Sequence, residues 1–419
     1  MLRPVDRSVE TLVVGAGPAG TAAATVLAGA GREVLVVDKA TFPRDKCCGD
    51  GLTTLALREL ERIGFDPGTV SRWQDVDSAW LRSPAGRLIE VPLPDRGLFA
   101  AVAPRIDLDA ALVDLARSGG AEILDGHGVT GVHRGAGHVD VDIDGVGRVR
   151  ARTVIAADGM WSTVRKATGL GIDGYRGEWH AFRQYFSGVT GAAATELIVW
   201  FEADLLPGYA WSFPLPGGRA NVGFGVLRTE GRRTRDMAEI WRDLLTREHV
   251  VSALGTGATP EGRHTAWPIP ARVDAIELAS PGVLFVGDAA AATDVLTGEG
   301  IGQALLSGRL AAEAVLAGGG PRAIADRYRE EVRSELVADH AMSRRLGRVL
   351  AHRRGAEAAL RVVAASGEWG RRNFARWMFE DEPRAIALTP SRWHRGMFAR
   401  AGTFTSTAGA DDRALTIGR

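Results

Sequence analysis

The chain has 419 residues, of which 45% are hydrophobic and 24% charged, so it is an ordinary globular sequence long enough for two domains. Its 51 basic and 51 acidic residues cancel, which excludes a global basic field for binding nucleic acid. Cys47 and Cys48 are adjacent and poorly placed for an ordinary disulfide, which fits a reducing, cytoplasmic setting. We find no His/Cys spacing typical of a metal site.

The uncharged stretch 12–31 follows Arg3 and Arg7 and therefore resembles a secretory signal. Asp6 and Glu10 contradict this interpretation, because they lie in the region that should be basic. No other uncharged apolar run is long enough to span a bilayer, so we do not expect an integral membrane protein.

A βαβ unit explains the same stretch better. The apolar run TLVV leads into GAGPAG at residues 15–20, a small-residue helix is expected from Thr21 to Leu27, and a second strand ends at Asp38. Asp38 follows the first glycine by about 20 residues, where a carboxylate reaches the ribose of an adenosine. The unit therefore predicts a dinucleotide site, for either NAD or FAD.

The three glycines of this turn have separate expected roles. Gly15 makes the tight turn, Gly17 lets the backbone approach a pyrophosphate, and Gly20 lets helix and strand pack closely. The phosphates would then lie at the helix N-terminus.

The next informative stretch, GYAWSFPLPGG at 208–218, reads as a strand. Its period of two places Tyr209, Trp211 and Phe213 on one face. These rings are either the core of a sheet or the wall of a cavity for a long apolar ligand.

Two other strand ends favour FAD. One apolar strand stops at Asp158-Gly159, and another stops at Gly287-Asp288 before the glycine cluster 298–302 opens a long Ala/Leu helix. An acid directed at a ribityl chain, followed by a helix N-terminus near an electron-rich ring, suits a flavin and suits NAD poorly. Each segment alone could equally be a turn with a capping Asp.

The order of these motifs resembles FAD-dependent oxidoreductases of the para-hydroxybenzoate hydroxylase fold from residue 9 to about 330. Within that group FPRDKCCGDGL (42–52), LPGYAWSFP (206–214) and TGEGI (297–301) are similar to the geranylgeranyl reductase family. The implied fold class is α/β (α+β), with a Rossmann-like FAD-binding domain, a substrate-binding β-sheet domain and a C-terminal helical region. The FAD-binding parts are expected at 1–78, 103–170 and 275–330, the substrate sheet at 79–102 and 171–274, and helices with a flexible tail at 331–419.

The resemblance also implies site residues. It places the strand of Tyr209, Trp211 and Phe213 in the sheet over the flavin, where these rings would line the substrate cavity beside the flavin ring. Arg44 and Arg105 should approach the FAD phosphates or ribityl chain, Asp288 the ribityl hydroxyls, and the backbone of 298–302 the pyrimidine edge of the ring. The cofactor-binding residues expected in full are Gly15, Gly17, Pro18, Ala19, Gly20, Asp38, Lys39, Arg44, Cys48, Gly49, Arg105, Asp158, Gly287, Asp288, Gly298, Gly300, Ile301 and Gly302. Relatives commonly carry a proline before TGEGI, where this chain has Val295.

The implied reaction is reduction of a prenyl C=C bond by hydride from flavin N5, with NAD(P)H or another low-potential donor as reductant. The family's cysteine falls on Cys48, the first candidate proton donor, and Tyr209 is the second; Cys48 could instead be a buried packing residue. A flavin-hydroperoxide aromatic monooxygenase, less readily a halogenase, is the alternative enzyme. A flavoprotein that only passes electrons or binds lipid is a third class.

Residues 341–400 hold 13 Arg against 5 Asp/Glu, with interleaved Trp and Phe. We expect a solvated helical cap here, and peripheral docking on an anionic membrane is the alternative. The polar segment 402–419 is expected to fray.

Overall fold

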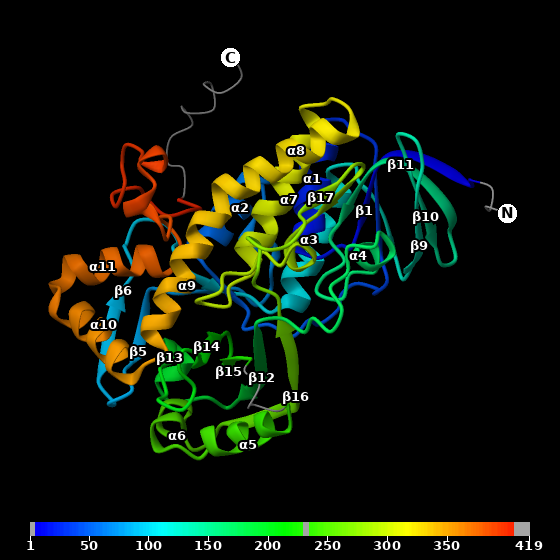
Figure 1. Ribbon diagram of the computed structural model, residues 1–419. Helices are drawn as coiled ribbons and strands as arrows, with labels where there is room; N and C mark the ends of the chain where they lie inside the picture. Colours follow the sequence, from blue (N-terminus) through cyan, green and yellow to red (C-terminus); the bar gives the residue numbers. More distant parts are fainter. Residues whose placement is uncertain (1–4, 229–233, 406–419) are drawn as a thin grey trace.

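The computed structural model describes residues 5–228 and 234–405. Its first sheet has the order β17-β18-β11-β1-β2-β8, and β10 joins β9 to β11 (Figure 1). The strands are β1 (Arg7–Val14), β2 (Val34–Asp38), β8 (Glu122–Asp125), β9 (Val129–Arg134), β10 (Val139–Ile143), β11 (Gly147–Ala156), β17 (Ala279–Ser280) and β18 (Val283–Phe285). From β18 to β8 neighbouring strands run parallel, so their carboxyl ends share one edge.

The predicted βαβ unit is confirmed in β1, α1 (Pro18–Gly29) and β2. The helix begins at Pro18, earlier than the expected Thr21, because proline suits the first helical position. The second strand ends at Asp38 as predicted. Helices α1, α3 (Arg105–Ser118), α7 (Ile301–Leu316) and α8 (Pro321–Val332) pack on this sheet and on one another. The buried, Val-rich strands are typical of a parallel sheet covered by helices.

The second sheet has the order β16-β12-β15-β14-β13-β5-β6 and is mixed, since β13 and β5 are parallel. Its strands are β5 (Ser78–Arg82), β6 (Leu88–Pro92), β12 (Trp179–Ser187), β13 (Leu197–Trp200), β14 (Tyr209–Leu215), β15 (Arg219–Leu227) and β16 (Thr259–Ile269). Helices α5 (Thr234–Leu244) and α6 (Glu248–Leu254) lie below it in Figure 1. Trp241 of α5 packs against Phe182 and Phe224 of the sheet. One face of this sheet is therefore a closed core.

A three-stranded sheet and two short helices complete this part of the fold. The strands are β3 (Gly51–Leu52), β4 (Gln74–Asp75) and β7 (Ala101–Val102), and the helices are α2 (Thr54–Arg62) and α4 (Thr163–Ala167). Thr53 caps α2 by accepting a hydrogen bond from the Ala56 amide. The residues just before β3 lie beside the second sheet, where Asn221 of β15 donates a hydrogen bond to the Cys48 carbonyl oxygen at 2.8 Å.

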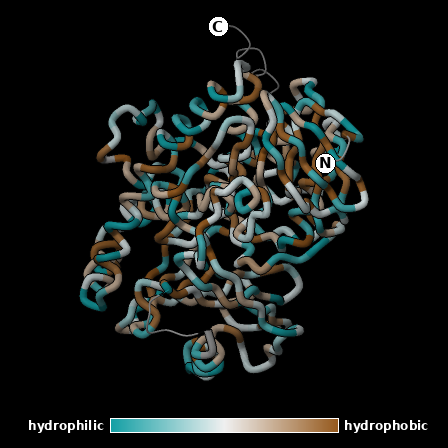
Figure 2. The backbone as a smooth tube through the Cα atoms, turned by 45° about the vertical axis from the view of Figure 1, so that its right-hand side comes forward, coloured by the Kyte–Doolittle hydropathy of each residue, from teal (hydrophilic) through white to brown (hydrophobic). Residues whose placement is uncertain are grey.

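The C-terminal region is helical, as predicted. It contains α9 (Ala338–Leu350), α10 (Arg353–Ala365) and α11 (Gly367–Met378), and α11 packs on β6 (Figure 1). Among the described helices none is long and apolar enough to cross a membrane. Hydrophobic stretches gather toward the interior of the molecule, and hydrophilic ones are prominent on the outer helices (Figure 2).

The expectation of fraying from residue 402 is wrong at its start. Thr403 is buried, and its backbone N–H and C=O both bond to Leu98. This backbone pairing anchors the segment against residues 97–98. The rest of the expected tail, 406–419, lies outside the described residues.

Candidate active site

A cavity of about 1200 Å³ connects the glycine-rich turn after β1 with the aromatic face of β14 and with α9–α11. Its volume exceeds the roughly 300–1,000 Å³ of most ligand pockets. The lining is mainly apolar, with acids and arginines gathered near the turn. One cavity of this size has room for a dinucleotide and a second ligand.

The glycine-rich turn is shaped by close approaches of backbone. Gly15 has φ +104°, and a Cβ there would lie 2.3 Å from the Ala157 carbonyl oxygen. A Cβ at Gly20 would lie 1.8 Å from the Gly15 oxygen, so Gly20 serves helix packing. A Cβ at Gly17 would meet nothing nearer than the Arg44 guanidinium at 3.6 Å. Since no side chain caps the N-terminus of α1, the first-turn amides are available to a ligand in the cavity.

Three acids lie at strand ends along the cavity. Asp38 accepts hydrogen bonds from the Ala16 amide at 2.7 Å and the Ala40 amide at 2.8 Å. Asp158 Oδ2 accepts a hydrogen bond from the Val164 amide at 3.0 Å, in the first turn of α4, whose N-cap is Ser162. Burial raises the pKa of Asp158. Asp288 pairs with Lys46 at 3.4 Å. All three acids line the cavity near the glycine-rich turn.

The two predicted arginines are fixed by one buried acid. Arg105 donates from Nε and Nη2 to Asp109, each at 2.7 Å, and Arg44 pairs with the same carboxylate at 2.8 Å. Both guanidinium groups line the cavity. The arrangement offers positive charge beside the glycine-rich turn.

Most of the predicted cofactor-binding residues line this cavity. They are Gly15, Gly17, Pro18, Ala19, Asp38, Lys39, Arg44, Cys48, Gly49, Arg105, Asp158, Gly287, Asp288, Gly298, Gly300 and Ile301. Gly20 and Gly302 are not among these lining residues. A Cβ at Gly20 would collide with the Gly15 backbone, which is the close packing expected of this glycine. A Cβ at Gly302 would stand 3.0 Å from the Ala56 amide nitrogen.

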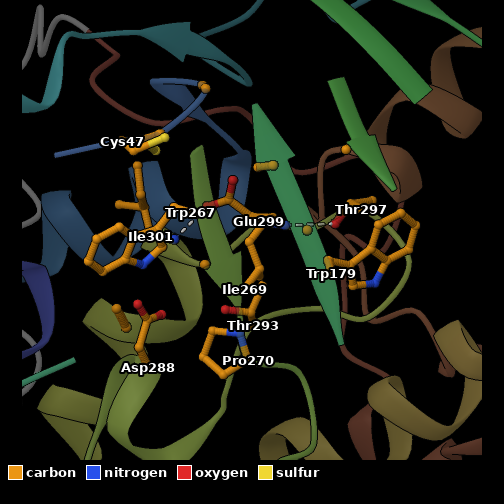
Figure 3. A pocket seen from close by; sticks show the side chains of 18 of the residues that line it. Cys47, Trp179, Trp267, Ile269, Pro270, Asp288, Thr293, Thr297, Glu299 and Ile301 are labelled. Atoms are coloured by element: carbon orange, nitrogen blue, oxygen red, sulfur yellow. Dashed lines mark hydrogen bonds between the residues drawn. The ribbon is translucent and has the colours of Figure 1, made fainter. Parts of the chain in front are cut away.

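The TGEGI turn places Glu299 at the centre of the view in Figure 3, with Trp179 and Trp267 on opposite sides. Its Oε1 accepts hydrogen bonds from the amides of Ile301 at 2.9 Å and Gly302 at 3.1 Å. Burial raises the pKa of Glu299 to about 7. The side chain is therefore an acid that can hold a proton at neutral pH.

The two predicted proton donors differ in their surroundings. Burial raises the pKa of the Cys48 thiol to about 11, so the thiol keeps its proton at neutral pH. Tyr209 donates its hydroxyl hydrogen to the Thr297 carbonyl oxygen, and burial raises its pKa as well. Both side chains line the cavity.

Strand β14 forms as predicted, and its three rings lie in a row on the cavity side. The centroids of Tyr209 and Trp211 are 6.0 Å apart, as are those of Trp211 and Phe213. Ala210, between them, packs into the closed core on the other face. The strand therefore presents an aromatic wall to the cavity, and its other face supplies core.

Sequence reasoning missed much of the lining. It did not find the indoles of Trp179 and Trp267 or the Glu299 side chain, and it interpreted α9–α11 as a solvated cap. These helices line the cavity with apolar side chains: Leu346, Val349, Leu350, Ala356, Ala359, Leu360, Val362, Val363, Phe374, Trp377 and Met378. Apolar residues at 346, 349 and 350, and at 356, 359, 360 and 363, recur at helical spacing, a signal present in the sequence.

The chain's residues fit FAD: an open glycine cradle at an uncapped helix, two arginines and three strand-end acids line one cavity that is large enough for a second ligand. Fold and site define an FAD-dependent oxidoreductase.

Comparison with known proteins gives the family. The FAD binding domain family matches residues 8–343, and this chain belongs to it. A menaquinone reductase of Mycolicibacterium smegmatis is 36% identical over 337 residues, covering 75% of this chain and 78% of that protein. Digeranylgeranylglycerophospholipid reductase 2 of Methanopyrus kandleri is 32% identical over 314 residues, covering 73% and 76%. The similarity to geranylgeranyl reductases is thus confirmed.

Solved structures share the fold. A geranylgeranyl bacteriochlorophyll reductase-like protein of Thermoplasma acidophilum superposes with a TM-score of 0.75 at 23% identity, covering 92% of this chain and 99% of that one. A halogenase in complex with FAD gives a TM-score of 0.68 at 17% identity, covering 91% and 84%.

Proposed function

We propose that this enzyme reduces C=C bonds in the prenyl chain of a lipid, with a prenylated quinone as the first substrate to test. The observation that carries the proposal is the continuity of the cavity, which joins the glycine cradle to an aromatic and aliphatic compartment. An apolar chain gains roughly 0.8 kcal/mol per buried CH₂ there without needing hydrogen bonds. Relatives named menaquinone reductase and digeranylgeranylglycerophospholipid reductase support a prenyl substrate.

Different segments of the chain bind the cofactor and the substrate. Segments 1–78, 103–170 and 275–330 hold FAD, and segments 79–102 and 171–274 supply the substrate sheet. Gly17 and the start of α1 receive the pyrophosphate, Asp38 the ribose, Arg44 and Arg105 the phosphates or ribityl chain, and Asp158 and Asp288 the ribityl hydroxyls. Bound, reduced FAD would supply the hydride, and NAD(P)H or another low-potential donor would reduce the flavin again.

The protein must fix the alkene and supply a proton in a dry pocket. Tyr209, Trp211 and Phe213 hold the chain so that one C=C lies within reach of the hydride. The Cys48 thiol gives its proton to the carbon that the hydride does not reach, and the resulting thiolate regains a proton from water after product leaves. Tyr209 is the second candidate donor, although its hydroxyl hydrogen is engaged with the Thr297 carbonyl.

The lipid reaches the cavity through peripheral contact of the C-terminal region with a membrane. Val349 and Val362 line the cavity although 52% and 70% of their surfaces are exposed, so they mark a mouth at α9 and α10. Trp369 on α11 is 79% exposed, and the surrounding segment is strongly basic. Exposed apolar side chains among arginines are typical of surfaces that bind anionic membranes.

The test is anaerobic single turnover. Enzyme reduced with dithionite is mixed with menaquinone or with the analogue whose side chain is fully saturated, after the quinone ring of each has been reduced to the quinol. We expect flavin reoxidation with the unsaturated chain alone. Equal reoxidation by both quinols would show that the prenyl chain is not the site of reduction. Turnover that appears only when the experiment is repeated with oxygen would indicate a monooxygenase.

A further inference from the structure

The loop that carries Cys48 is tied to the second sheet by a buried acid. Asp50 is fully buried and lines the cavity. Its Oδ2 accepts hydrogen bonds from the Tyr185 hydroxyl at 2.6 Å and from Asn221 Nδ2 at 2.8 Å, and its Oδ1 accepts one from the Arg105 amide at 3.2 Å. All three partners are donors, so a carboxylate can satisfy them together.

Asn221, on β15, joins three parts of the site. It is fully buried, and its Nδ2 contacts the Cys48 carbonyl oxygen at 2.8 Å as well as Asp50. Its Oδ1 accepts a hydrogen bond from the Trp211 indole at 3.2 Å. One amide group therefore fixes both the backbone of the thiol-bearing residue and the middle ring of the aromatic wall.

Packing reinforces this link. A Cβ at Gly51 would lie 3.0 Å from the Phe213 ring, and one at Gly49 would lie 3.5 Å from the Trp211 ring, so the loop rests directly on the wall. On β15, a Cβ at Gly223 would lie 2.4 Å from Trp211, which shows that the strand makes room for the indole. Asp50 also adopts φ +65°, a left-handed conformation that Asp tolerates better than most residues.

We propose that Asp50 and Asn221 are positioning residues that hold the Cys48 loop in register with Trp211, so that the proton donor and the bound alkene meet in a fixed geometry. The inference rests on the proposed function. Neither residue needs to touch the substrate, because each acts through Cys48 or Trp211. A displacement of about 1 Å between reacting groups can lower turnover by about 100-fold.

The sheet offers a matched control on its opposite face. Gln184 is also buried and accepts a hydrogen bond from a tryptophan indole at 3.2 Å, but its partner is Trp241 in the closed core. Asn221→Ala and Gln184→Ala therefore remove equivalent tryptophan contacts on the cavity face and on the core face.

The test measures Cys48 directly, in the FAD-loaded protein carrying Cys47→Ser. We expect Asn221→Ala to raise the rate of Cys48 alkylation by iodoacetamide by about tenfold or more, since its loop loses buried hydrogen bonds, while Gln184→Ala alkylates at the parent rate. Burial is the main cause of the raised pKa of Cys48, and the negative charge of Asp50 raises it further, so Asp50→Asn should also accelerate alkylation at a given pH. In single turnover, the rate constant of flavin reoxidation falls about 10- to 100-fold in Asn221→Ala and stays near the parent value in Gln184→Ala.

Parent-like alkylation in Asn221→Ala would overturn the link, as would equal acceleration in Gln184→Ala. If the parent reduces no prenyl chain, the proposed function fails, and alkylation alone then decides whether the loop is held by Asn221.

Discussion

Cys48 and Glu299 line the same cavity and hold protons with different pKa values, which makes the identity of the acid measurable. The Cys48 thiol, with a pKa raised to about 11, stays protonated across the neutral range; the Glu299 carboxyl, with a pKa raised to about 7, loses its proton as pH rises through neutrality. If Cys48 is the donor, the single-turnover rate stays level from about pH 7 to about pH 10, and Cys48→Ser lowers it about 100-fold or more.

A contrary result would name the other acid. A rate that falls about tenfold per pH unit above about 7 in the parent, and loses this dependence in Glu299→Gln, would assign the proton to Glu299. If Cys48→Ser and Glu299→Gln both match the parent, Tyr209→Phe is the next variant.

A substitution at Gly17 tests whether the glycine-rich turn after β1 binds the cofactor. A valine there would project into open cavity rather than into protein, so the fold should persist while the space for the pyrophosphate is lost. We expect Gly17→Val to purify largely colourless with a nearly unchanged melting temperature. Gly29→Val, at the far end of α1 where a Cβ meets nothing within 4 Å, should stay yellow. Full flavin occupancy in Gly17→Val would contradict the cofactor site.

The sequence predicted the glycine-rich turn and the acid at the end of β2 because short motifs fix the local backbone geometry. Gly15 needs its positive φ, and Asp38 follows at the end of β2. The Glu299 side chain was missed because its pKa depends on burial in the folded cavity, which no local pattern encodes.

At the scale of elements, the sheet that contains β14 has a cavity face and a closed core face, and a variant on each face distinguishes the two roles. Trp211→Ala enlarges an existing cavity, so we expect intact flavin binding, a modest loss of melting temperature and a large loss of alkene reduction. Trp241→Ala, on the closed face of the same sheet, should cost about 3–5 kcal/mol of stability and lower the melting temperature sharply. A similar loss of stability in both variants, with turnover per folded molecule unchanged in Trp211→Ala, would assign Trp211 to the core.

Period-two spacing predicted β14 correctly, yet the spacing alone did not decide whether its rings faced a cavity or a core, and only the family resemblance favoured the cavity. That choice depends on what lies opposite, and the opposite elements include the 47–51 loop and α10, far apart in sequence. The C-terminal helices were interpreted from their arginines, although Leu360 and Val363 are buried against β5 and β6. The many arginines indicated an exposed outer face of these helices. The helical spacing of their apolar residues indicated a buried inner face, and this second signal was not used.

At the scale of the whole molecule, the cavity mouth and the basic C-terminal region predict binding to anionic vesicles that fades with salt. Each arginine near such a surface contributes about 1 kcal/mol, screened beyond about 10 Å at 0.1 M salt. Trp369→Ala should weaken sedimentation with anionic vesicles, whereas Trp161→Ala, an exposed tryptophan outside this region, should not. Equal binding to neutral and anionic vesicles would contradict membrane contact through this surface.

The central claim, reduction of a prenyl C=C bond, is tested most directly by the mass of the lipid product. The enzyme is incubated anaerobically with dithionite and menaquinone, and the extracted lipid is then reoxidised in air so that any quinol returns to quinone. We predict a product heavier by two hydrogens per reduced bond, with both added hydrogens in the prenyl chain on fragmentation. Recovery of the starting mass after reoxidation, or an oxygen-dependent gain of one oxygen atom, would contradict the account.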